Sequence, residues 1–159
     1  MVDRKDIGSW LEGPGARTGT SSAYPGERLG LPREGAGSLG RVGRRVVGVL
    51  IDWTLCQLIA RALFGVPLPF TGVATGGQSA TILGLFALEN LLLVGTLGST
   101  LGHRVVGLHV RSMDGRAARP LQTLVRTVLL CLFLPAMFWD RDGRGLHDKA
   151  AGTLIVRTR

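Results

Sequence analysis

The stretch that decides the fold is "GRRVVGVLIDWTLCQLIARALF", residues 43–64. From residue 46 onward it is almost entirely apolar, with Asp52 as its one acid, and its length is close to the roughly 20 residues that a membrane-spanning helix needs. A second apolar run of similar length extends over residues 80–101. We therefore expect an α-helical membrane protein with two transmembrane helices.

Composition and charge support this class. Apolar residues make up 45% of the 159 residues and charged residues only 19%, below the roughly 25% that is usual for soluble domains. The formal net charge is +8, and the basic residues flank the apolar runs instead of lining one helical face. This arrangement is typical of cytoplasmic flanks of membrane helices and not of a nucleic-acid-binding surface. It predicts a cytoplasmic N-terminus and an external loop at residues 65–79.

A third apolar run, "LVRTVLLCLFLPAMFWDRDGRG" at residues 124–145, is too short to cross a membrane readily. The 13 uncharged residues between Arg126 and Asp140 give about 20 Å of helix, whereas the hydrocarbon core is about 30 Å thick. Full crossing would also place the basic C-terminal residues outside. We expect a re-entrant or interfacial helix broken at Pro135, with a complete third span as the alternative.

Two short β-branched segments, residues 104–112 and 151–159, are bounded by turn signals. Isolated strands are not stable in water, so these segments should pair with each other. They are expected to form a small β pair on the cytoplasmic side, within a membrane domain that covers residues 41–159.

Residues 1–40 form a separate segment rich in glycine and proline, without helical or strand periodicity. Such composition predicts an extended cytoplasmic tail. Apolar side chains are nevertheless spaced along it, and they suit the docking of an extended segment on a partner protein. A solvated tail without a partner is the alternative. The candidate docking residues are Trp10, Leu11, Tyr24, Leu29 and Leu31.

The acids inside the apolar runs need partners, because an unpaired charge in a bilayer costs several kcal/mol. Asp52 is expected to form a charge pair with Arg126 or with Arg45, which lies about two helical turns earlier on the same face. Glu89 and Asn90 lie near the middle of the second run, where an acid is either a proton site or a contact to a partner helix.

His147 and Asp148 are adjacent near the C-terminus, but no nucleophile motif accompanies them. Asp148 is expected to cap the closing turn or to pair with Arg104 or Arg126 at the cytoplasmic rim. The sequence has no catalytic or phosphate-binding motif and no zinc-like ligand spacing. We therefore expect no enzyme, no metal and no cofactor.

Three separated motifs resemble those of the RDD family of bacterial membrane proteins. Arg45 precedes Asp52 in an "R-x6-D" pattern, "GTLGSTLGHRVVGLHV" closes the second apolar run, and "GRGLHDKAAGTLIV" supplies a second acid, Asp148. The tail fragments "GSWLEGPG" and "PGERLGLP" are similar to the N-terminal extension of actinobacterial members. One departure is His103, at a position where a basic residue often follows the glycine of the family's turn.

The resemblance covers about residues 41–158 and implies an integral protein of the bacterial inner membrane. Ion or proton exchange has been proposed for some members of that family. Two functions are therefore expected as alternatives. The first is an accessory subunit or assembly factor that docks on a larger membrane complex, and a respiratory complex is one candidate host. The second is an oligomeric ion or proton transporter that uses the intramembrane acids, and it needs a homo-oligomer because two spans enclose no pathway.

Overall fold

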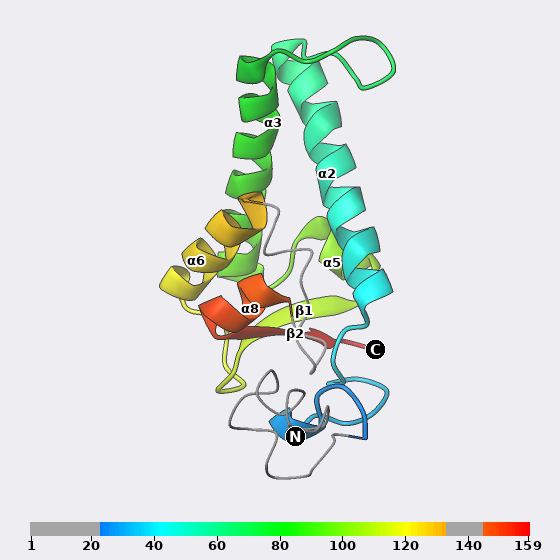
Figure 1. Cartoon of the computed structure of the whole chain (residues 1–159), viewed down its shortest axis with the longest axis vertical. Coiled ribbons are helices and arrows are strands. Elements are labelled where there is room, and N and C mark those ends of the chain that lie inside the picture. Colours follow the sequence, from blue (N-terminus) through cyan, green and yellow to red (C-terminus); the bar gives the residue numbers. More distant parts are fainter. Residues whose placement is uncertain (1–22, 133–144) are drawn as a thin grey trace, which may run out of the picture.

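The computed structural model describes residues 23–132 and 145–159 of the chain. Two long helices stand side by side and define the shape of the molecule (Figure 1): α2, Val42–Phe64, and α3, Gly76–Glu89. The second helix continues through one π-helical turn, η3 (Asn90–Val94), into the short α4 (Gly95–Leu97). The connecting loop lies at one end of the pair, and the other elements gather at the opposite end, which we call the base.

Both long helices have the length and composition of membrane spans. Val42–Phe64 and Gly76–Leu97 have mean hydropathies of 1.6 and 1.8, and only 22% of each apolar window is buried within the chain. A core helix of a soluble protein is mostly covered by its own fold, so this exposure favours surroundings of lipid or partner helices. The expected membrane protein with two spanning-length helices is thus supported.

The base contains the small sheet that the sequence predicts. Strand β1, Leu108–Ser112, pairs antiparallel with β2, Thr153–Arg157, and Val110 lies opposite Ile155. The buried face of this pair packs with Val94 and Ala118 into a small apolar core. The predicted pairing is confirmed, although residues 104 and 105 of the expected first segment belong to a helix, Leu101–Val105, instead.

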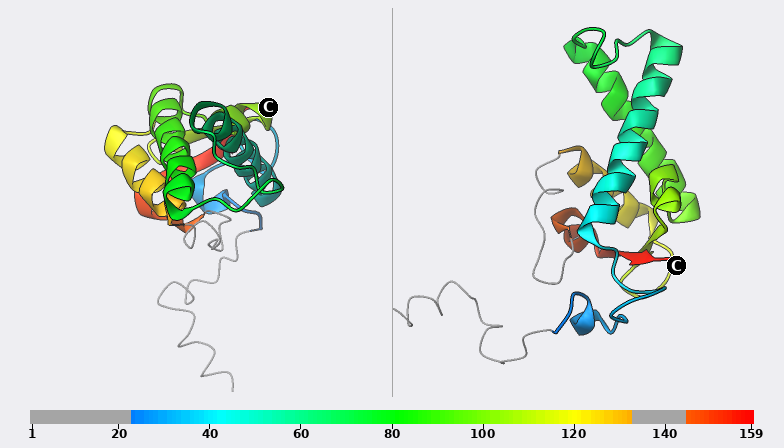
Figure 2. Two further views of the ribbon diagram at one scale, coloured as in Figure 1. Left: turned by 90° about the horizontal axis from the view of Figure 1, so that it is seen from above. Right: turned by 90° about the vertical axis from the view of Figure 1, so that its right-hand side faces the viewer.

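Three short helices complete the base: α5 (Leu101–Val105), α6 (Pro120–Cys131) and α8 (Leu146–Ala151). Helix α6 packs against α8, η3 and the lower part of α3 (Figures 1 and 2). Its 12 residues correspond to about 18 Å, well short of a bilayer core. The rest of the third apolar run, with Pro135, lies outside the described residues, so its course through the membrane stays a prediction.

The glycine- and proline-rich tail is folded onto the base over its described part. The N–H groups of Gly37 and Gly40 donate to the carbonyls of Arg157 and Ile155, and the N–H of Arg157 donates to Ser38, each at 2.8 Å. Residues 37–40 therefore extend the sheet along the second edge of β2. Composition alone predicted an extended tail without structure here, but burial of Leu39, which is 7% exposed, and backbone pairing hold these residues in place.

Candidate functional site

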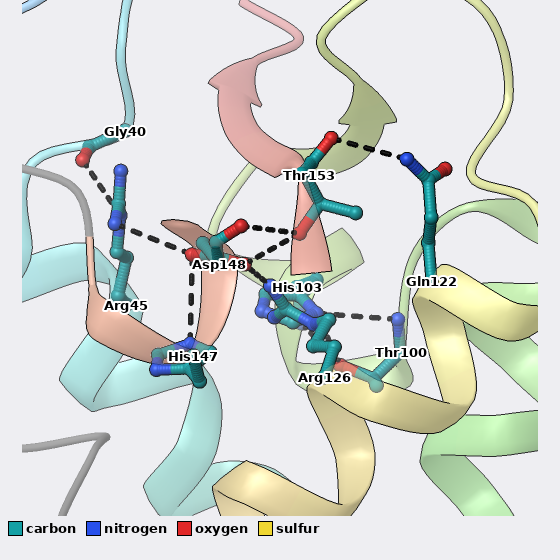
Figure 3. A network of polar contacts seen from close by, with 10 residues as sticks. Gly40, Arg45, Thr100, His103, Gln122, Arg126, His147, Asp148 and Thr153 are labelled. Atoms are coloured by element: carbon teal, nitrogen blue, oxygen red, sulfur yellow. Dashed lines mark hydrogen bonds and ion pairs between the residues drawn. The ribbon is translucent and has the colours of Figure 1, made fainter. Parts of the chain in front are cut away.

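The base holds a cluster of buried charged side chains centred on Asp148 (Figure 3). The Asp148 carboxylate is completely buried in the first turn of α8. It forms an ion pair with Arg126 and a longer one, 3.6 Å, with Nη1 of Arg45. The hydroxyl of Thr153 donates to it at 3.1 Å. One carboxylate thus joins α2, α6, α8 and β2.

Both arginines of this cluster are almost inaccessible, at 6% exposure for Arg45 and 2% for Arg126. Arg45 lies in the first turn of α2, and its Nε donates to the carbonyl of Gly40 at 2.9 Å, so it also fastens the tail strand. Charges removed from water in this way are tolerated only when they are paired and hydrogen-bonded. Asp148 is therefore the group on which the burial of both arginines depends.

The charge states follow from burial. Burial, and then the neighbouring charge of Arg45, lower the pKa of Arg126 to about 9, so its guanidinium stays protonated at neutral pH. Burial and the nearby charges of Arg126 and Arg45 lower the pKa of His103 to about 3. His103 is therefore neutral in the folded protein across the physiological pH range. A second histidine, His147, lies beside the cluster, with its Nε2 3.5 Å from the Asp148 carboxylate.

The neutral His103 makes the protein sensitive to acid. The unfolded chain takes up a proton on this residue below about pH 6.5, whereas the folded chain does not until about pH 3. Stability is thus fully present above pH 6.5 and falls as the pH drops towards 3, by about 2 kcal/mol at about pH 5. His103→Gln should reduce the loss of melting temperature between neutral pH and about pH 5 in detergent. The half-buried His109 provides the control: if His109→Gln reduced the loss as much, His103 would not be its source.

Asp52 lies in a second buried site, where α2 meets the start of α5. Its carboxylate accepts the hydroxyl of Thr100 at 2.5 Å and the backbone N–H of Gly102 at 2.6 Å. The expected pairing of Asp52 with Arg45 or Arg126 is therefore wrong, because both arginines are directed to Asp148. The first turn of a helix has N–H groups without helical partners, and a carboxylate is well suited to accept from them.

A close approach of two glycines makes this contact possible. A Cβ atom on Gly102 would collide with the carbonyl of Gly48 and would lie 2.9 Å from Cγ of Asp52. Helix α5 therefore reaches the α2 backbone only because residue 102 has no side chain. The reverse position is less crowded, since a Cβ on Gly48 would lie 3.5 Å from Val106.

Glu89 belongs to the same site. Its side chain lies close to Asp52, and the thiol of Cys56 donates to its Oε2 at 3.2 Å. The next residue, Asn90, opens the π-helical turn and donates to the carbonyl of Phe86 at 3.0 Å. Such turns often occur at functional sites.

A short chain of contacts connects the two sites. Oγ1 of Thr100, which donates to Asp52, also lies 2.8 Å from Nδ1 of His103. His103 in turn lies beside Arg126 in the Asp148 cluster (Figure 3). Asp52, Thr100 and His103 therefore form a polar path from helix α2 to the base, and Glu89 lies close to its Asp52 end.

Arg126 should be energetically coupled to Asp148 but not to Asp52. Asp52→Asn keeps an acceptor for Gly102 and should cost about 1 kcal/mol, whereas Arg126→Ala breaks a buried pair and should cost about 3–5 kcal/mol. The double mutant of these two should be additive within about 0.5 kcal/mol, while Arg126→Ala and Asp148→Asn should not be additive. Apparent stability in detergent measures both cycles. Coupling above about 1 kcal/mol between Asp52 and Arg126 would contradict the separate sites.

The remaining predicted residues are placed as follows. Nε of Arg104 donates to Ser99 at 3.2 Å, so Arg104 belongs to the rim and not to the Asp148 cluster. Tyr24, Leu29 and Leu31 are half-buried on the tail beside the base, and Trp10 and Leu11 lie outside the described residues. The residues that sequence reasoning missed are Thr100, Gly102 and Thr153. A "T-x-x-H" capping pattern at the start of α5 was the signal available for the first of them.

Within residues 23–132 and 145–159, no three histidine, cysteine, aspartate or glutamate side chains gather to hold a metal ion. A comparison with family models matches residues 39–152 to the model described as the RDD family. The matched segment begins at the tail strand and ends after Asp148, so it contains both buried acids, Asp52 and Asp148. No curated protein and no solved structure gives a significant match to the chain.

Proposed function

Because the chain belongs to the RDD family and carries two apolar helices of spanning length, it is a membrane protein, and we propose that it acts as a non-enzymatic accessory subunit or assembly factor of a larger membrane complex. In this proposal it lies in the bacterial inner membrane with its base in the cytoplasm. The helix pair provides an apolar surface for lipid and partner helices, and the tail docks on the partner.

The observation that carries this proposal is the attachment of residues 37–40 to β2. This attachment anchors the C-terminal end of the tail to the base. The preceding segment lies outside the region that the family model matches, so it is an addition to the common domain. A segment of this length with spaced apolar side chains, anchored at one end, suits capture of an extended partner surface.

The use of the intramembrane polar groups also favours docking over transport. Asp52 already accepts two hydrogen bonds within the chain, and the Asn90 amide is bonded to its own helix. The outward side chains of the two helices are large and apolar, as a surface for lipid or other helices requires. They include Val46, Leu50, Leu58, Leu63, Leu88 and Leu92.

Two truncations separate docking from folding. Deleting residues 2–35 keeps residues 37–40 and should lower the melting temperature in detergent only slightly, through loss of the Gly35 carbonyl that accepts from Ser38, while abolishing copurification of partner subunits from native membranes. Deleting residues 2–40 also removes Leu39 and the carbonyl of Gly40 that binds Arg45, so it should lower the melting temperature much further. If the shorter deletion copurified the same partners in equal amount, docking through the tail would be wrong.

A second function rests on a separate observation, the chain of contacts from Asp52 through Thr100 to His103, with Glu89 close to Asp52. Acids and histidines inside membrane proteins are typical components of proton relays. In this alternative several copies enclose the pathway. Gentle purification from native membranes distinguishes the two proposals, since a pure homo-oligomer without foreign subunits favours proton transfer and a stoichiometric foreign subunit favours docking.

A further inference from the structure

A hollow of about 440 Å³ opens on the surface of the base, where α2 begins and α5 ends. Arg44 lies in the first turn of α2, at the level where a spanning helix leaves the headgroup region. The hollow therefore lies at the boundary between water and hydrocarbon. Its lining consists of Gly43, Arg44, Val47, Val105, Val106 and Arg159.

The polar part of this lining is purely cationic. Arg44 and Arg159 contribute two guanidinium groups, and none of the six lining residues is acidic. Nη1 of Arg44 donates to the carbonyl of Val106 at 3.3 Å, which holds the guanidinium beside another lining residue of the hollow. The stem of Arg159 lies along the backbone at Gly107, where a Cβ would be 3.3 Å from its Nε. Planar guanidinium groups suit the oxygens of a phosphate.

The rest of the lining is apolar and accessible. Val47 follows Arg44 by almost one helical turn towards the membrane-spanning part of α2, and 48% of it is exposed. Val105, on α5, is 64% exposed. A site for a free phosphate ion gains nothing from two exposed valines next to its arginines. A phospholipid needs both features, because its phosphate joins an apolar chain.

From this juxtaposition we infer that the hollow binds the headgroup phosphate of an anionic phospholipid, with Arg44 and Arg159 holding the phosphate and Val47 and Val105 contacting the adjoining acyl chain. The inference concerns a lipid of the surrounding bilayer and does not depend on which protein the tail binds.

Competition between two lipids tests the inference. The full chain in mild detergent is given an equal mixture of phosphatidylglycerol and phosphatidylcholine, and the lipid retained is measured by native mass spectrometry. The wild type should retain phosphatidylglycerol preferentially. Arg44→Gln with Arg159→Gln should lower its apparent affinity by about 25-fold, because each arginine near an anionic surface contributes on the order of fivefold. Arg159→Gln alone, at an exposed position, should cause about a fivefold loss.

The charge-matched control is Arg116→Gln with Arg119→Gln, two exposed arginines near the end of β1 that do not line the hollow. This control should retain phosphatidylglycerol as the wild type does. Equal losses in both double variants would show general electrostatic attraction and overturn the site. Displacement of the lipid by inorganic phosphate at an equal concentration would also overturn it, because the valines would then contribute nothing.

Discussion

Replacing Asp148 with asparagine is expected to cost about 3–5 kcal/mol of the free energy of unfolding. Two buried guanidinium groups, those of Arg45 and Arg126, share this carboxylate. Asparagine preserves the size of the side chain and an acceptor for Thr153, so the loss measures the charge itself. The apparent melting temperature in detergent and the yield of folded protein in the membrane should both fall sharply.

Asp114→Asn is the matched control for this substitution. Asp114 forms an ion pair of similar length, 3.6 Å, with Arg119, but both side chains are largely exposed. Surface pairs of this kind contribute about 0–1 kcal/mol, so the control should behave like the wild type. If Asp148→Asn were as mild as Asp114→Asn, the burial of the arginines would not depend on Asp148.

Replacing Gly102 with alanine is expected to cost about 3 kcal/mol or more. The new methyl group would collide with the carbonyl of Gly48, which is backbone and has little freedom to move, and would lie 2.8 Å from Oδ1 of Asp52. Helix α5 must then move away from α2. Overpacking itself costs about 1–3 kcal/mol, and the charged hydrogen bond from the Gly102 N–H to Asp52 contributes about 1.5–3 kcal/mol that would be partly lost.

Two other glycines provide controls. A Cβ on Gly84, in α3, meets no atom within 4 Å, so Gly84→Ala should be neutral or stabilising by up to about 1 kcal/mol. Gly48→Ala probes the same helix contact from the α2 side, where the nearest neighbour would be 3.5 Å away. It should cost far less than Gly102→Ala. Equal effects at positions 48 and 102 would mean that the contact is not limited by residue 102.

The sequence was sufficient for the two long helices and the strand pair, because these depend on local properties, but it did not predict α5 or α8. A run of apolar residues long enough to cross a bilayer predicts α2 and α3, and two β-branched segments without other partners predict β1 and β2. The π-helical turn after Glu89 could not be predicted, since a single widened turn leaves no pattern in the order of apolar residues.

The partner of Asp52 could not be predicted for a different reason. Two arginines and two acids, Asp52 and Asp148, allow several pairings, and charge alone does not choose among them. Asp52 instead accepts a hydrogen bond from the backbone N–H of Gly102. Every residue except proline has this group, and no sequence pattern marks it. Only the packing of α5 on α2, fifty residues apart in sequence, brings this group to the carboxylate.

The tail illustrates a tertiary effect that outweighs composition. Residues 37–40 contain two glycines and a serine and have no strand propensity of their own. They are held because the free edge of β2 offers backbone partners and because Leu39 is buried beside it. Edge pairing of this kind depends on an edge that forms elsewhere in the chain, so local sequence gives no signal for it.

The central position of Asp148 has a consequence for biosynthesis. Arg45 is synthesised roughly a hundred residues before Asp148, a delay on the order of 5–20 s at ordinary rates of translation. During that interval both long helices can leave the insertion machinery while the guanidinium of Arg45 lacks its final counter-ion. The base therefore closes only after translation has passed α8, and a nascent chain stalled before residue 148 should remain sensitive to protease at its membrane-proximal end.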